Sequence, residues 1–296
     1  MAKNSYWYHL MAIITVIIWG TTFISTKILI AHGLHPSEIF FYRFLLAYIC
    51  IWFFSWHRLW AASKKDELLF AAAGLTGGSL YFLFENTALT ITLASNVALI
   101  LCTAPLLTAF VYFLIHRKEK LKPNFIYGSV MAFIGVALVI FNGGFILKIN
   151  PIGDMLTLLA ALMWAFYSLI IKGLNNKYPT LFVTRKVFFY GLLTILPAFY
   201  FEPLHLDPKV LFQPAVFMNL VFLGLIASML CYIMWNVSTK KLGVLRVTNY
   251  IYLCPVVTLI ASSLMLNEII TLIALAGSVL IMTGVYVAER GFRLRS

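Results

Sequence analysis

A glutamate inside an apolar run is the residue of this chain that most directly suggests chemistry. Glu85 lies in the stretch LYFLFENTAL, residues 80–89, among leucine, phenylalanine and tyrosine. A charge near the middle of a bilayer costs at least about 2.5–3.5 kcal/mol on insertion scales, so it indicates a specific role. On a helix, Tyr81 lies one turn earlier on the same face and Asn86 is adjacent. We therefore expect this segment to border a functional site.

Three roles are open for this carboxylate. It can form a structural pair with one of two cations toward the same side of the membrane, either Lys27 near the end of the first apolar run or Arg43 about two turns into the second. It can contact the amine of a substrate. It can also carry a proton, in which case the activity of the protein would depend on pH and Glu85→Gln would abolish that dependence.

Aromatic and amide side chains inside other apolar runs form a second group of candidates. Trp19 and Trp164 lie too deep in their runs for anchoring at the membrane surface, so they either pack helices together or line a cavity suited to apolar or aromatic solutes. Phenols and amides can fix a zwitterion without the cost of a buried charge, although interhelical hydrogen bonding is their alternative role. The further candidates for substrate binding are Asn96, Tyr167, Tyr232, Asn236 and Tyr252.

Prolines and glycines indicate where the helices bend or approach closely. Pro105 and Pro255 interrupt backbone hydrogen bonds within two runs, so each gives a static kink or a gating hinge. Small residues let membrane helices pack closely. We predict such contacts at Gly74, Gly77, Gly78, Gly128 and Gly135.

The composition places all of these residues in a membrane. The 296 residues are 62% hydrophobic and 11% charged, whereas soluble domains carry about 25% charged residues. Apolar runs long enough to cross a bilayer follow one another along the chain. The sequence therefore predicts an all-α integral membrane protein with ten transmembrane helices, over residues 10–30, 39–56, 68–88, 94–115, 125–141, 155–171, 181–201, 215–235, 244–266 and 269–288.

The charge distribution predicts the orientation in the membrane. The net charge of +12 does not indicate a nucleic-acid partner, because the basic residues lie in short loops between the apolar runs. Alternate loops carry nearly all of them, and the opposite set holds only Lys148 and Lys209. The positive-inside rule then places both termini in the cytoplasm. We expect a multi-pass, monomeric protein of the cell inner (plasma) membrane, with the lipid bilayer as its surroundings.

The two halves of the chain carry the same punctuating residues in the same order. WGTTFISTK (19–27) parallels WAFYSLIIK (164–172), and the further equivalent pairs are Pro36 and Pro179, Gly74 and Gly224, Asn86 and Asn236, Pro105 and Pro255, Glu119 and Glu268, Gly128 and Gly277, and Gly135 and Gly284. Each half holds an odd number of helices, so the second must cross the membrane upside down. The sequence predicts two inverted five-helix repeats, residues 1–147 and 148–296, with a substrate site near mid-membrane where they meet.

The halves are not chemically equivalent. Glu85 has Trp235 as its counterpart, and Arg43 has Lys186. The carboxylate is thus an asymmetric addition to a repeated scaffold.

This ordered set of features resembles the EamA type of the drug/metabolite transporter superfamily. The resemblance covers essentially the whole chain and consists of the two repeats, Trp-Gly-x-x-Phe in the first helix, Pro36 and Arg43 at the start of the second, and Glu…Gly…Gly closing each half. It implies a ten-helix carrier, often an exporter of amino acids or other small metabolites. It also implies a central cavity lined mainly by helices from both repeats.

We therefore expect a secondary active transporter that exports small metabolites, such as amino acids or related amphipathic and aromatic solutes. It would work by alternating access, with a small-molecule substrate and a possible coupled proton as its partners. The alternatives are an importer or exchanger of nucleobases, amines or drugs, and a structural membrane protein that transports nothing. Filter-like motifs typical of channels are absent from the sequence.

Catalysis, metal binding and cofactor binding are not predicted. The histidines lie at or near the ends of the apolar runs, and no second acid accompanies Glu85 within a run. No phosphate-binding loop for ATP is present. The four cysteines, Cys50, Cys102, Cys231 and Cys254, have no metal-ligand spacing.

Overall fold

The computed structural model describes residues 5–56, 59–92, 94–116, 123–141, 150–204, 207–257, 260 and 271–290. These residues form helices of three kinds, and no strand occurs among them. The elements of the first half are α1 (Ser5–Ala31), α2 (Pro36–Phe54), α3 (Lys64–Gly74), η1 (Leu75–Ser79), α4 (Leu80–Ile91), α5 (Ala94–Leu101), α6 (Ala104–Ile115) and α7 (Pro123–Phe141).

The second half repeats this order with more interruptions. Its elements are α8 (Pro151–Lys177), α9 (Thr180–Ile195), α10 (Ala198–Phe201), α11 (Pro208–Leu211), α12 (Pro214–Val221), η2 (Phe222–Leu230), α13 (Cys231–Leu242), α14 (Val244–Thr248), η3 (Asn249–Leu253) and α16 (Leu272–Arg290).

Seven helices within the described residues are long and apolar enough to cross a membrane. They are Tyr6–Ala31, Pro36–Phe54, Lys64–Ile91, Val97–Ile115, Pro151–Lys177, Thr180–Phe201 and Pro214–Leu242. Shorter apolar helices, Pro123–Leu138, Val244–Val257 and Leu275–Ala288, occupy the positions of the other three predicted spans. The chain is a multi-pass, all-helical membrane protein.

The predicted helix ends need correction in the third and fourth spans. The third helix begins at Lys64 rather than at residue 68, because the Ser63 side chain accepts a hydrogen bond from the backbone N–H of Asp66 and caps the first turn. The fourth span is divided into α5 and α6 around Cys102 and Thr103. Pro105 lies in the first turn of α6, where its missing N–H is tolerated.

Two π-helical segments, η1 and η2, lie at equivalent positions of the two halves. Gly74 precedes η1 and its counterpart Gly224 lies within η2. The wider π turn occurs mostly as short insertions in α-helices, frequently at functional sites. The sequence pattern gave no sign of either segment. Both lie in the third helix of their half, in the middle of the bundle.

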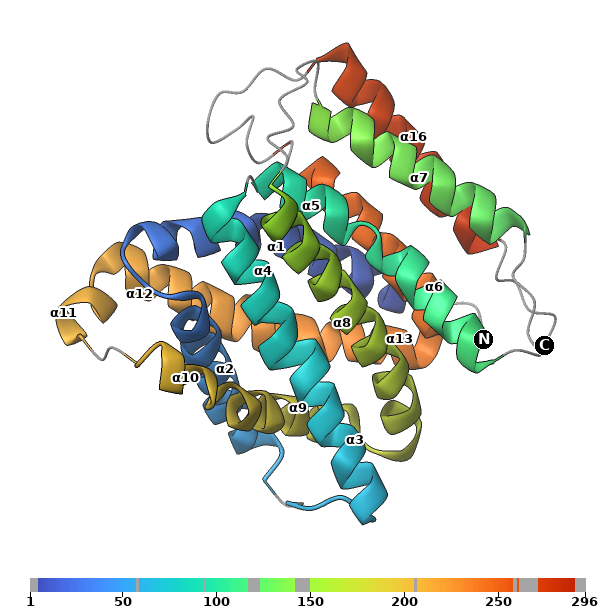
Figure 1. The fold of residues 1–296 in the computed structure, drawn as a ribbon. Coiled ribbons are helices and arrows are strands. Elements are labelled where there is room, and N and C mark those ends of the chain that lie inside the picture. Colours follow the sequence, from blue (N-terminus) through green and yellow to red (C-terminus); the bar gives the residue numbers. More distant parts are fainter. Residues whose placement is uncertain are drawn as a thin grey trace.

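Helices of the first half pack mainly against helices of the second. The principal contacts join α1 to α13, α4 to α8, α3 to α9 and α2 to η2. Figure 1 shows the resulting bundle, in which α3, η1 and α4 together cross the middle of the molecule beside α8. Residues from both halves form one large buried core. The two halves therefore interlock and share one interior.

The last helix of each half, α7 and α16, pack against each other at one edge of the bundle (Figure 1). A Cβ atom at Gly128 would lie 2.5 Å from the Gly284 carbonyl oxygen, and one at Gly135 would lie 2.7 Å from that of Gly277. The later glycine of α7, Gly135, meets the earlier glycine of α16, Gly277, so the two helices run antiparallel. The close-packing prediction for Gly128 and Gly135 is confirmed, and the equivalent glycines exchange partners across the contact.

Candidate functional site

A buried cavity lies between the two halves, and we call it the central cavity. Its walls come from α1, α2, α4, α5, α6, α8, α13 and η3, together with residues beside them. The cavity volume is about 60 Å³, room for on the order of four waters at the roughly 10–15 Å³ that each requires. Six candidates from the sequence line it: Trp19, Arg43, Tyr81, Glu85, Trp164 and Tyr232.

The other predicted site residues are placed elsewhere or lie outside the described side chains. Asn86, Tyr167, Asn236 and Tyr252 are fully buried but are not part of the cavity lining. Lys27 is not part of it either. The side chain of Asn96 lies outside the described part of the chain. The prolines Pro105 and Pro255 do not line the cavity, but Ala104 and Cys254, which directly precede them, do.

Aromatic rings form the walls of the cavity. The rings of Trp19 and Trp164 meet edge to face with their centroids 5.2 Å apart, an arrangement that aromatic pairs prefer. Tyr81 lies 5.3 Å from Trp164, and Tyr232 lies 6.1 Å from both tryptophans. The tryptophans occupy equivalent positions in the two halves, so their direct contact places the junction of the repeats at the cavity.

Two π-segment carbonyls accept hydrogen bonds from these rings. The Tyr232 hydroxyl donates to the Gly77 carbonyl oxygen in η1 at 2.6 Å, and the Trp19 indole N–H donates to the Ala227 carbonyl oxygen in η2 at 2.9 Å. Gly77 and Ala227 are separated by the same offset as Gly74 and Gly224, so the two carbonyls are counterparts. Each half thus supplies an aromatic donor to the π segment of the other.

The Trp164 indole N–H differs from that of its counterpart. It is buried, with only 4% of the residue exposed, and has no hydrogen-bond partner among the described residues. The acceptor that symmetry would give it, the Gly77 carbonyl, already receives the Tyr232 hydroxyl. A buried unsatisfied donor costs about 1–3 kcal/mol. This donor borders the cavity, where a ligand can satisfy it.

Arg43 and Glu85 bring opposite charges to the same cavity. They are 2% and 6% exposed, so both are buried. The Arg43 Nε–H donates to Ser228 Oγ at 2.9 Å, and its guanidinium lies 4.2 Å from the Phe82 ring centre. The Tyr81 hydroxyl donates to Glu85 Oε1 at 3.3 Å. The two charges interact through space, but within the described residues they form no direct ion pair.

The paired asparagines hold helices together. Asn86 Nδ2 donates to the Pro36 carbonyl oxygen at 3.2 Å. Asn236 Nδ2 donates to Thr184 Oγ1 at 3.0 Å, and its Oδ1 accepts the Tyr167 hydroxyl at 3.1 Å. Each amide joins the third helix of its half to the second helix. These contacts match the interhelical role that the sequence left open for them.

Sequence reasoning missed several residues of the cavity wall. Phe23, Phe82, Cys102 and Ile251 line it, and so does Thr22. Phe23 lies four residues after Trp19, on the same helical face, so helical spacing could have identified it. Nothing in the sequence pattern distinguished Cys102 or Ile251 from the surrounding apolar residues.

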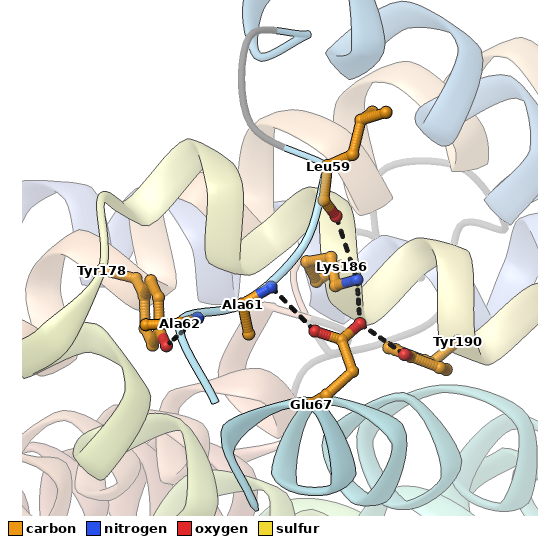
Figure 2. Close-up of polar contacts among 7 residues, drawn as sticks. All are labelled: Leu59, Ala61, Ala62, Glu67, Tyr178, Lys186 and Tyr190. Atoms are coloured by element: carbon orange, nitrogen blue, oxygen red, sulfur yellow. Dashed lines mark hydrogen bonds and ion pairs between the residues drawn. The ribbon is translucent and has the colours of Figure 1, made fainter. Parts of the chain in front are cut away.

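A second polar cluster joins the two halves at the start of α3, and we call it the polar clasp. It consists of Asp66, Glu67, Lys177, Tyr178, Lys186 and Tyr190, with the backbone of residues 59–62. Figure 2 shows Glu67 accepting hydrogen bonds from Lys186, Tyr190 and the Ala61 N–H, the last at 2.8 Å. Lys186 also donates to the Leu59 carbonyl oxygen at 3.2 Å.

The neighbouring acid completes the clasp. Asp66 pairs with Lys177 at 2.8 Å and accepts the Tyr178 hydroxyl at 2.8 Å. The Tyr178 hydroxyl in turn accepts the Ala62 N–H at 2.9 Å (Figure 2). Both acids belong to the first half and both cations to the second. The clasp therefore fastens the halves to each other at one end of the bundle.

Within the described part of the chain, no three His, Cys, Asp or Glu side chains come together as metal ligands.

The fold and the cavity define a class: multi-pass membrane proteins built of two repeats around a buried, charged and aromatic site. The model of the EamA-like transporter family matches this chain twice, over residues 6–141 and 151–289. The chain belongs to the EamA-like transporter family. The two matches establish the two-repeat architecture, and the resemblance to EamA transporters seen in the sequence is confirmed.

Relatives that match from three quarters to nearly all of the chain carry transporter names. A "Probable amino-acid metabolite efflux pump" of Salmonella typhimurium is 30% identical, covering 96% of this chain and 95% of its own. An "Uncharacterized transporter" of Archaeoglobus fulgidus is 28% identical, covering 94% of this chain and 96% of its own. A "Probable terminal-alkyne amino-acid exporter" of Streptantibioticus cattleyicolor is 26% identical, covering 76% of this chain and 74% of its own. These names indicate transporters and not enzymes.

A solved structure shares the fold. It superimposes with a TM-score of 0.75 and covers 95% of this chain and 97% of its own at 17% sequence identity. At that identity the likeness concerns the fold alone.

Proposed function

We propose that this protein is a secondary active transporter that exports small metabolites, such as amino acids or related amphipathic and aromatic solutes, by alternating access around the central cavity. The observation that carries the proposal is the joint presence of Arg43, Glu85 and the Trp19–Trp164 wall in one buried space. The efflux-pump and exporter names of two relatives support the direction and the solute class.

The proposed architecture is ten membrane helices in two inverted five-helix repeats, 1–147 and 148–296. The antiparallel contact of α7 and α16 and the twin tryptophan contact support it. The protein would lie in the cell inner membrane. Both termini would face the cytoplasm, because the positive-inside rule places the basic loops on the cytoplasmic side. One chain supplies all walls of the cavity, which is consistent with a monomer.

A zwitterion would require the central cavity to widen, because its volume in this structure admits only about four waters; the lining suggests how the solute would then lie. A solute carboxylate fits near the Arg43 guanidinium and the Trp164 N–H, since a charge-assisted bond is stronger than a neutral one. The ammonium fits near Glu85, where Tyr81 already orients one carboxylate oxygen. The apolar part would then lie against Trp19, Tyr232 and Phe23. Each group of the solute would meet a partner that is already buried.

We infer that the clasp acts as the gate on the basic side of the membrane. Glu67 and Glu85 lie on one continuous run of helix, about 27 Å apart at 1.5 Å per residue. The clasp is therefore well separated along this helix from the central cavity. Opening this end of the bundle would break the ion pairs between the halves, and closing the opposite end would compensate. In each transport cycle, contacts between the halves at one end of the bundle would be replaced by contacts at the other end.

A second role proposed for Glu85 is carriage of a coupled proton. Its buried position and the absence of a direct ion pair with Arg43 leave the carboxylate able to change protonation when a solute leaves. Solute binding and proton binding would then compete for one group. The amine contact and the proton contact would occur in different steps of one cycle.

The test is a counterflow assay in proteoliposomes with radiolabelled amino acids, nucleobases and amines. The proposal expects exchange of at least one aromatic or apolar amino acid, and expects Glu85→Gln to lose the dependence of transport on pH. The matched control is Glu202→Gln, an exposed acid outside the cavity, which should behave as the unmodified protein. If no solute moved under any gradient, the carrier proposal would be wrong. If Glu85→Gln kept the pH dependence, proton carriage by Glu85 would be wrong.

A further inference from the structure

A second cavity lies beside the polar clasp, between α2, α9 and the chain segment that precedes α3. Its volume is about 150 Å³, larger than that of the central cavity, and we call it the interfacial pocket. Tyr48, Leu59, Trp60, Arg185, Lys186 and Phe189 line it. Among these described side chains two carry positive charge and none carries negative charge.

The two cations are buried at the base of this pocket. Arg185 is 2% exposed and Lys186 is 4% exposed, although both are among the most hydrated side chains in other settings. Glu67 of the clasp is the carboxylate that pairs with Lys186. Glu67 is not part of the pocket lining, whose charged side chains are the two cations.

Aromatic rings surround the cations and mark a position at the membrane surface. The Lys186 ammonium lies 5.0 Å from the Trp60 ring centre and 5.5 Å from that of Phe189. Trp60 itself is 68% exposed and forms the rim. Other large aromatic side chains at the same end of α2 are also exposed: Trp52, Phe53, Phe54 and Trp56. Tryptophan-rich belts of this kind lie at the level of the lipid headgroups.

Depth along the helices agrees with that position. Arg185 follows the start of α9 at Thr180 by about 8 Å of helix rise, and Tyr48 precedes the end of α2 at Phe54 by about 9 Å. The pocket therefore lies just inside one surface of the bundle, where phospholipid phosphates are found. It is on the side that carries most of the basic loops.

We propose that the interfacial pocket binds the phosphate of an anionic phospholipid, with Arg185 as its principal ligand and Lys186 as the second. The planar guanidinium matches two phosphate oxygens at once. Basic pockets between membrane helices on the cytoplasmic side bind such headgroups in other membrane proteins. The site is separate from the central cavity and does not depend on which solute is carried.

Binding there would act on the clasp through Lys186. This ammonium holds Glu67 and the Leu59 carbonyl oxygen while it also borders the pocket. A lipid phosphate would compete with Glu67 for Lys186 and loosen the joint between the halves. The lipid composition of the membrane would thereby set how readily this end of the bundle opens.

The test is native mass spectrometry of the purified full-length protein after equilibration with equimolar phosphatidylglycerol and phosphatidylcholine. We expect preferential retention of phosphatidylglycerol. Arg185→Gln should lower that retention at least about fivefold, the factor expected for one cation near an anionic surface. Arg185→Lys should keep most of it. The control Lys241→Gln removes an exposed cation outside the pocket and should change nothing.

Two further arms keep the proposal falsifiable. Trp60→Glu places a negative charge on the exposed rim without altering a buried side chain, so it should lower phosphatidylglycerol retention even if Arg185→Gln fails to fold. Equal retention of both lipids by the unmodified protein, or unchanged retention in Trp60→Glu, would overturn the proposal. Displacement of the bound lipid by millimolar inorganic phosphate would instead assign the pocket to a soluble phosphate compound and would overturn the lipid assignment.

Discussion

The central cavity and the polar clasp use counterpart cations in opposite ways. Arg43 and Lys186 occupy the same place in the two halves, and both are buried. Lys186 is bound directly by a carboxylate, a carbonyl and a ring of aromatic groups. Among the described residues, the hydrogen bond of Arg43 goes to Ser228, and Glu85 lines the same cavity without forming an ion pair with it. Lys186 thus joins the two halves directly, whereas Arg43 borders the central cavity with fewer bonds to the protein.

The largest effect is expected from breaking the clasp. Lys186→Met leaves the Glu67 carboxylate without its cation, and breaking a buried pair by removing one partner costs about 3–5 kcal/mol. Because Glu67 keeps part of its exposure and two other donors, the lower end of that range should apply. Thermal unfolding in detergent should show the loss. The double variant Glu67→Leu with Lys186→Met should recover most of it, and a double variant as unstable as the single one would contradict the ion-pair interpretation.

The next effect concerns transport rather than stability. Arg43→Met removes the only cation that lines the central cavity among the described residues. A hydrogen bond to a charged group contributes about 1.5–3 kcal/mol, so kcat/KM for an amino acid should fall roughly tenfold to a hundredfold. The measurement is initial uptake into proteoliposomes. Adding Glu85→Gln should not restore transport. A restored rate would mean that Arg43 and Glu85 form a structural pair like that of the clasp.

The twin tryptophans give a smaller and sharper contrast. Trp164→Phe keeps an aromatic wall and removes an N–H that has no partner among the described residues, so it should raise KM about fivefold, as for the loss of about 1 kcal/mol of solute binding, and should not lower stability. Trp19→Phe removes the bond to the Ala227 carbonyl oxygen and should lower stability by about 1 kcal/mol. Paired uptake and thermal unfolding measurements test this. Equal effects of the two variants on both quantities would contradict the assignment.

The smallest effect is expected at the edge of the clasp. Lys177 is 58% exposed, and exposed ion pairs contribute about 0–1 kcal/mol. Lys177→Gln should therefore lower the unfolding free energy by less than 1 kcal/mol, and added salt should shrink the difference. Denaturation at low and high ionic strength tests it. A loss as large as that of Lys186→Met would show that the Asp66 pair contributes as much to the clasp as the Glu67 pair.

The sequence predicted the repeat and the centre of the cavity because both depend on residue types that punctuate the chain. Trp19 and Trp164 were paired by spacing alone, and the structure places their rings in contact. Glu85 was identified because a charge in an apolar run has few explanations. Residue type and spacing along the chain can be read from a single sequence.

The clasp and the π segments could not be predicted in the same way. Glu67 falls in a polar stretch that resembled a loop, and its partner Lys186 is distant in the sequence. Their meeting depends on how α3 packs on α9, which no local pattern encodes. The π turns of η1 and η2 lie where the halves contact each other, as in the hydrogen bond from the Tyr232 hydroxyl to the Gly77 carbonyl oxygen, and such contacts have no local signal in the sequence. Asn86 and Asn236 are equivalent in the two halves, but that equivalence does not show whether they bind a solute or join helices.

The antiparallel glycine contact between α7 and α16 has a consequence for the origin and assembly of the chain. Gly128 meets Gly284, and Gly135 meets Gly277, so the contact maps onto itself when the halves are exchanged. This is the contact pattern of an isologous interface in a two-fold symmetric dimer. The protein can be regarded as such a dimer fused into one chain. Co-expressed fragments 1–147 and 148–296 should then assemble without a covalent connection.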